Sequence, residues 1–175
     1  MKKDVWLWQL AGFAFATALG TLLHFLYDWT DLSIFTPISA VNESTWEHMK
    51  ILFFPMLIFA FFQSVFFRND YPNFWWIQLT GIFVGVISVP VLFYTYNGAF
   101  GKTPDWLNVL FFFISSGGAF LLQGFLFRRP SKLDLDWIAL AILLTIAAVF
   151  VAFTYYPPYL PLFQDPITGG YGLTT

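Results

Sequence analysis

The sequence predicts an all-α polytopic membrane protein, a bundle of five transmembrane helices, and three observations lead to this prediction. Of the 175 residues, 58% are hydrophobic and only 10% are charged, against about 25% charged residues in an ordinary soluble domain. Five separate stretches reach the length of about 20 predominantly apolar residues that a helix needs to cross a bilayer. Tryptophan lies at the ends of these stretches, where the membrane–water interface favours amphipathic rings. We therefore expect a single membrane domain, residues 1–175.

The five expected spans follow one another with short connections. The first begins close to the N-terminus, but its apolar run is longer than the roughly 7 to 15 residues of a secretory signal, so we expect it to be retained. Pro55 and Pro90 lie inside the second and third spans, where proline removes a helical hydrogen bond and bends the helix. Such bends are either simply tolerated or open an outward-facing cavity. The expected spans are residues 5–27, 46–67, 74–96, 106–127 and 137–156.

Basic residues predict the orientation of the bundle. Lysine and arginine in short connections favour the cytoplasmic side of a membrane. They are frequent at the N-terminus and after the second and fourth spans, whereas the opposite side holds Lys102 and, at a helix edge, Lys50. We therefore expect the N-terminus to be cytoplasmic and the C-terminus to lie outside. The residues that decide this are Lys2, Lys3, Arg68, Arg128, Arg129 and Lys132.

The last segment of the chain, residues 157–175, is expected to be ordered but not to form a sixth helix. Its four prolines oppose a helix, and its three glycines permit tight turns. Leucine, phenylalanine, isoleucine and tyrosine side chains recur between them, which a disordered tail would not need. We expect this tail to fold back over the outer mouth of the bundle, with Asp165 near the polar cluster described below.

A layer of glutamines is a second polar feature of the spans. Gln9, Gln63, Gln78 and Gln123 each lie four residues from the cytoplasmic end of a span. Interhelical hydrogen bonds explain such a layer. A polar conduit is the alternative, but no ionisable residue accompanies the amides, as relays and ion paths normally require.

Composition also narrows the classes of function. The chain has 8 basic and 10 acidic residues, so it lacks the basic surplus that nucleic-acid binding requires. It has no cysteine, which excludes disulfides, thiolate metal sites and a cysteine nucleophile. The lipid bilayer is the partner that the composition does indicate, and any chemistry must come from histidines, carboxylates, amides and hydroxyls.

Ionisable residues gather at the start of the second span. The only two histidines, His24 and His48, lie at the outer ends of consecutive spans, and consecutive elements usually pack together. Asp28 follows His24 by one turn, and Glu47 precedes His48. Two imidazoles and two carboxylates suit zinc or another divalent transition metal. The predicted metal ligands are therefore His24, Asp28, Glu47 and His48.

The remaining polar residues suggest a reaction. Glu43 is left over as a general base for a metal-bound water. Asn42, Lys50 and Asp165 are candidates for binding substrate. Together these assignments predict a metal-dependent hydrolase acting on a lipid or lipid-like substrate that enters between the bent helices. The alternatives are a carrier or binding protein for a small amphiphile or cation, and an accessory subunit whose outer surface docks a partner.

Several of these residues also have a purely structural explanation, although the capping box does not account for Glu43, His48 or Lys50. Ser44 and Glu47 fit a capping box, in which both side chains bond exposed amides at a helix start. His24 could be an interfacial imidazole bonded to Asp28 or to a carbonyl group. The carboxylates could be solvated loop charges. The spacing matches no established metalloenzyme motif, including H-E-x-x-H.

Three stretches carry a resemblance to a known family. V-N-E-S-T-W-E-H at 41–48, H-F-L-Y-D-W-T at 24–30 and P-L-F-Q-D-P-I-T-G-G-Y-G-L at 161–173 resemble a family of small bacterial integral-membrane proteins of unknown function. The shared patterns are N-E-S-x-W-E-H and F-x-D-P-x-T-G-x-Y-G. The resemblance implies a bacterial inner-membrane location and a tail that belongs to the fold. It implies no catalytic role for any residue.

Overall fold

Five long helices make up most of the protein. The computed structural model describes residues 4–129 and 136–173, and the described part of the chain contains no β-strand. Each long helix has the length and composition needed to cross a membrane. This confirms the prediction of an all-α, multi-pass membrane protein. The helices are α1 (Val5–Thr30), α2 (Thr45–Phe67), α3 (Phe74–Phe100), α4 (Asp105–Phe127) and α5 (Asp136–Tyr155).

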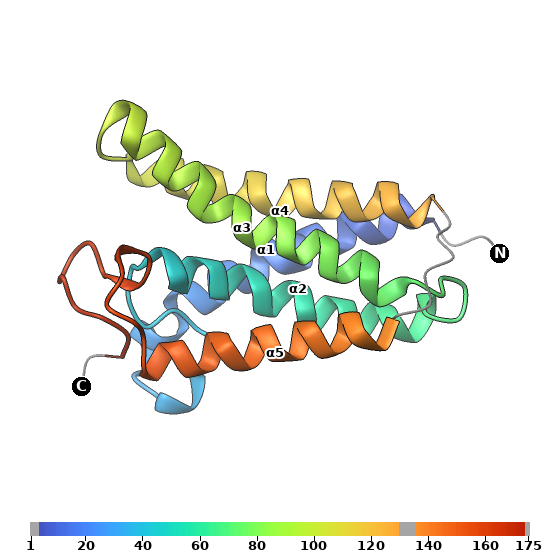
Figure 1. Ribbon diagram of the computed structural model, residues 1–175, viewed down its shortest axis with the longest axis horizontal. Coiled ribbons are helices and arrows are strands. Elements are labelled where there is room, and N and C mark those ends of the chain that lie inside the picture. Colours follow the sequence, from blue (N-terminus) through green and yellow to red (C-terminus); the bar gives the residue numbers. More distant parts are fainter. Residues whose placement is uncertain (1–3, 130–135, 174–175) are drawn as a thin grey trace.

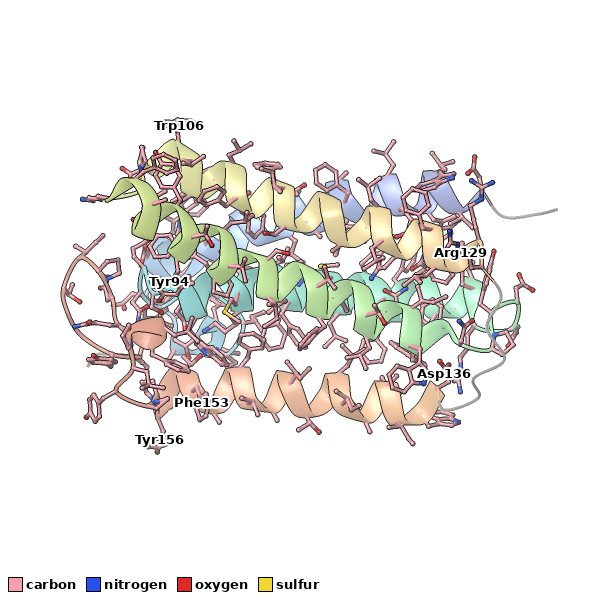
Figure 2. All side chains as sticks on the ribbon, turned by 45° about the horizontal axis from the view of Figure 1, so that its top comes forward. Tyr94, Trp106, Arg129, Asp136, Phe153 and Tyr156 are labelled. Carbon is pink, nitrogen blue, oxygen red and sulfur yellow. The ribbon has the colours of Figure 1, made fainter. Side chains whose placement is uncertain are left out.

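The helices run alternately up and down, so the bundle has two distinct ends (Figure 1). The end that holds residues 157–173 is called the tail end below, and residues 157–173 are called the tail. The short 3₁₀ helix η1 (Ser33–Phe35) and the start of α2 also lie there. Figure 2 shows Trp106, Tyr94 and Tyr156 toward the tail end, with Arg129 and Asp136 at the opposite end.

Two helices extend beyond their expected ends. α1 continues past residue 27 to Thr30. The next residue, Asp31, adopts a left-handed conformation (φ 51°) and donates its backbone N–H to the Tyr27 carbonyl at 2.8 Å. α3 continues past residue 96 to Phe100 and is capped by Gly101. These extra turns are more polar than the membrane-crossing runs, so hydrophobicity alone places the helix ends too early. The extension of α1 makes Asp28 a helical residue.

α2 is the most buried helix and contacts all the others. Pro55 lies inside it without ending it, and because proline has no N–H, the Ile51 carbonyl loses its helical donor. A Cβ atom built at Gly20 of α1 would lie only 2.9 Å from that carbonyl oxygen. Glycine at position 20 therefore lets the two backbones approach closely, as small residues do in membranes.

The tail packs over the ends of α2 and α5 and includes one short 3₁₀ helix, η2 (Pro161–Phe163). The Phe163 ring lies 4.6 Å from the Trp46 ring, centroid to centroid. The Leu173 N–H donates to the Thr154 carbonyl at 2.9 Å. The tail is thus held by apolar packing at its middle and by a backbone hydrogen bond at its end.

The orientation of the bundle in the membrane remains a prediction. Of the basic residues that predict it, Lys2, Lys3 and Lys132 lie outside the described residues. Arg68 and Arg129 lie at the end opposite the tail, as the prediction requires.

Candidate metal site

Two histidines and one glutamate converge at the tail end of α1 and α2. The His24 and His48 rings lie 5.2 Å apart, centroid to centroid. The Glu43 carboxylate lies between them, with Oε1 3.9 Å from His24 Nε2 and Oε2 3.5 Å from His48 Nε2. One donor atom from each residue can be chosen so that all lie within 4.8 Å of one another. These three residues are called the triad below, and they could hold a metal ion.

The loop before α2 brings Glu43 to the two imidazoles. Ser44 caps α2, because its side chain accepts the Glu47 N–H at 3.3 Å. The Asn42 side chain accepts the Ser44 N–H at 2.9 Å and so turns the chain sharply before the helix. Only half of the expected capping box forms, because Asn42 rather than Glu47 bonds the Ser44 N–H. The turn places Glu43 beside His48.

A backbone contact selects the tautomer of the neutral His48 ring. Nδ1 lies 2.9 Å from the Ser44 carbonyl oxygen. A carbonyl can only accept a hydrogen bond, so Nδ1 carries the hydrogen and the Nε2 lone pair of the neutral ring is free. Metal-ligating histidines usually donate their second ring N–H in this way. His48 Nε2, which lies 3.5 Å from Glu43 Oε2, could therefore bind a metal ion.

The triad is partly open to its surroundings. The side chains of His24, His48 and Glu43 are 24%, 26% and 39% exposed. Ligand atoms about 2.0–2.1 Å from a tetrahedral zinc lie about 3.3 Å from one another. The nitrogen–oxygen distances of 3.9 and 3.5 Å are longer than this, and the donor atoms lie within 4.8 Å of one another, so the side chains would have to move closer together to bind zinc.

Glu47 and Lys50 form a separate, buried ion pair. The Lys50 Nζ lies 2.5 Å from Glu47 Oε2, and the side chains are 0% and 1% exposed. Lys50 also donates to the Thr36 carbonyl at 3.0 Å and to the Thr154 hydroxyl at 2.7 Å. Glu47 accepts the Val41 N–H at 3.1 Å. The pair thus joins α2, α5 and the loop that carries Glu43.

The other predicted site residues lie outside the triad. Asp28 is exposed, one turn after His24 on α1. Asn42 Nδ2 donates to the Gly172 carbonyl at 2.9 Å and so ties the loop to the tail. The Asp165 carboxylate is used within its own turn, where it accepts from the Ile167 N–H and from the Thr168 hydroxyl. Their predicted roles as ligand or substrate-binding residues stay predictions.

The geometry favours a different division of roles from the one that the sequence suggests. Glu43, expected to be the base, lies with the imidazoles, whereas Glu47, expected to be a ligand, is bonded to Lys50. The partners of Lys50, which are Thr36 and Thr154, could not be predicted from the sequence. A lysine inside a span signals that such partners exist, but nothing in the sequence says which residues they are.

An apolar cavity of about 230 Å³ lies on the other side of α2. It is bounded by α2, α3 and α5, and its lining includes Trp46, Phe53, Val86 and Phe150. Trp46 and His48 are two residues apart, so they point about 200° apart around the helix. The cavity is therefore not part of the triad.

The fold and the triad together define the class of protein: a multi-pass helical membrane protein with an open group of two histidines and one glutamate at one end of the bundle. The chain belongs to a family of unknown function, DUF6512, whose model matches residues 1–173. The family match thus covers both the triad and the tail. No curated protein and no solved structure matches the chain.

Proposed function

We propose that the triad binds a divalent transition metal, with zinc as the first candidate. We further propose that the protein is a metal-dependent hydrolase of a lipid or lipid-like substrate. The observation that carries the proposal is the convergence of His24, Glu43 and His48. The hydrogen bond from His48 Nδ1 to the Ser44 carbonyl supports it, because it leaves Nε2 free to bind metal.

The ligand set agrees with hydrolytic chemistry. Two histidines and one glutamate are the protein ligands of several catalytic zinc sites, in which the fourth position remains open for water or substrate. Zinc bound in this way polarises a carbonyl or lowers the pKa of a bound water to about 7. Partial exposure of the triad gives a substrate access from the tail end.

The surroundings of His24 favour an amphiphilic substrate. The Phe25 ring lies 4.6 Å from the His24 ring and stacks on Trp29 at 5.4 Å. Trp29 is 68% exposed and lies near the end of α1, where tryptophan favours the membrane–water interface. A lipid headgroup at this depth would reach the triad while its chains remain among exposed apolar side chains.

Metal content of the purified protein tests the proposal. We expect about one zinc per chain after zinc loading and removal of free metal, and a loss of at least about tenfold in affinity for His24→Ala or for His48→Ala. Asp31→Asn is the matched control. Asp31 is an exposed acid in the loop between α1 and α2 that also carries Glu43, and asparagine tolerates its positive φ. Absence of bound metal, or equal binding by the His24→Ala/His48→Ala variant, would refute the metal site.

Cation binding without hydrolysis is the second candidate function. It is favoured by the placement of the two glutamates, since Glu43 lies in the triad and Glu47 is paired with Lys50. Neither is then left as an independent general base. Incubation of the zinc-loaded protein with phospholipid vesicles separates the two candidates. Release of a hydrolysed product supports the hydrolase, whereas zinc binding with intact lipids supports the binding protein.

A further inference from the structure

A second polar group is buried between the helices, about one turn from the end of the bundle opposite the triad. One glutamine from each of α1 to α4 is buried there, with exposed fractions of 3% or less. They are Gln9 (3%), Gln63 (0%), Gln78 (1%) and Gln123 (0%).

Three of the four amides form a hydrogen-bonded chain with one direction of donation. Gln123 Nε2 donates to Gln78 Oε1 at 3.0 Å. Gln78 Nε2 donates to Gln63 Oε1 at 2.8 Å. The chain therefore begins on α4, crosses α3 and ends on α2. This is the interhelical bonding that the glutamine layer suggests.

The chain leaves a matched set of unpaired polar atoms. Gln63 Nε2, at one end, is a buried donor without a partner, and Gln123 Oε1, at the other end, is a buried acceptor without a partner. Both amide atoms of Gln9 are also buried and unpaired. Gln9 thus offers the acceptor that Gln63 lacks and the donor that Gln123 lacks.

Close contacts show where α1 passes at this depth. A Cβ atom at Gly12 would lie 2.5 Å from the Phe120 ring and 2.6 Å from the Phe59 ring. A Cβ atom at Gly124 would lie 2.5 Å from the Trp6 ring. α1 therefore fits tightly between α2 and α4 over the first two turns, with contacts on either side of Gln9.

Helix geometry places Gln9 at the level of both ends of the amide chain. Gln63 follows Phe59 by one turn on α2, and Gln123 lies between Phe120 and Gly124 on α4. Gln9 lies between the two α1 positions that make the contacts with those helices. The buried Gln9 amide therefore lies at the same level of the bundle as the unpaired donor of Gln63 and the unpaired acceptor of Gln123.

We propose that the four amides enclose an ordered-water site in the membrane interior. Water accepts from Gln63 Nε2 and Gln9 Nε2 and donates to Gln123 Oε1 and Gln9 Oε1, which closes the chain into a ring. Buried water typically makes about three hydrogen bonds to polar groups that would otherwise be unsatisfied. The site carries no titratable group, so it holds water without the charged relays of an ion path.

Magnetisation transfer from water to side-chain amides tests this site directly. The experiment uses the full-length, ¹⁵N-labelled protein in phospholipid bilayers and solid-state NMR. Signals of Gln9 and Gln63 are assigned by their loss in Gln9→Met and in Gln63→Met. We expect both amides to receive magnetisation from a water that exchanges slowly with the bulk. Absence of transfer to both amides overturns the proposal.

A double-mutant cycle provides a second, independent measurement. Gln9→Met and Gln63→Met each remove one member of the ring, and each should lower the unfolding midpoint by about 2–4 °C or more. The double variant should lose less than the sum of the two, because the water is already released in each single variant. The control pair combines Gln9→Met with Thr145→Val on α5, because Thr145 is exposed and its hydroxyl donates to the Ala141 carbonyl of its own helix. This pair should be additive. Additivity of the Gln9 and Gln63 changes also overturns the proposal.

Discussion

Lys50 is the most deeply buried cation among the described residues, and its surroundings explain how a membrane helix tolerates it. The ammonium group has three donors, and Glu47, the Thr36 carbonyl and the Thr154 hydroxyl accept from them. Glu47 in turn bonds the Val41 N–H. An unpaired charge at this position would be costly, whereas a paired and hydrogen-bonded one is stable.

Breaking this pair should strongly destabilise the protein. We expect Lys50→Met to lower the free energy of unfolding by about 3–5 kcal/mol, because the Glu47 carboxylate is left buried without its cation. The double variant Glu47→Gln/Lys50→Met should recover part of that loss. Unfolding in detergent measures both. Lys102→Met, which removes an exposed lysine, should have little effect, and a double variant as unstable as the sum of its parts would contradict the pairing.

At the scale of the element, close helix contacts depend on particular glycines. Gly12 and Gly118 both lie inside long helices, but only Gly12 faces another helix. We expect Gly12→Ala to destabilise by about 1–3 kcal/mol, because its methyl group would overlap the Phe120 and Phe59 rings. Gly118→Ala meets nothing within 4 Å and should stabilise α4 by up to about 1 kcal/mol. Unfolding midpoints that shift in the same direction would contradict this account.

The elements could be predicted from sequence because the membrane imposes a local rule. Length and hydrophobicity decide where a span lies, and both can be read within about 20 residues. The pairing of consecutive helices also brought His24 and His48 together as expected. The predicted helix ends were less accurate, because a helix can continue for a polar turn after its hydrophobic run has ended. The last turn of α1, which carries Asp28, is an example.

The partners of the two glutamates could not be predicted in the same way. Glu43 and Glu47 are four residues apart and chemically identical, so the spacing does not decide which one meets the imidazoles. Which glutamate meets the imidazoles depends on the path of the 31–44 loop and on Thr154, which is more than 100 residues away in sequence from Lys50. Only long-range contacts direct Glu47 to Lys50 and leave Glu43 beside His48.

At the scale of the whole molecule, the tail connects distant parts of the chain. It contacts Trp46 through Phe163, Thr154 through Leu173 and Asn42 through Gly172. We expect truncation after Tyr156 to lower the unfolding midpoint and to weaken zinc binding, because Asn42 would no longer hold the turn before Glu43 against the tail. Zinc titration and thermal unfolding measure the two effects. A chain that ends at Leu173 is the control, and an unchanged truncated protein would show that the tail is dispensable.

The orientation of the bundle decides which side of the membrane the triad serves. Arg68, Arg128 and Arg129 lie at the end opposite the tail, and basic residues in short connections favour the cytoplasm.

Cysteine labelling tests this orientation. The chain has no cysteine, so a single introduced cysteine is its only thiol and reports one position. Ile167→Cys, at a side chain 77% exposed in the tail, should react with a membrane-impermeant maleimide on intact cells. Asn69→Cys, exposed in the connection between α2 and α3, should react only after the membrane is permeabilised. The reverse pattern would place the triad on the cytoplasmic side and redirect the search for its substrate to that side.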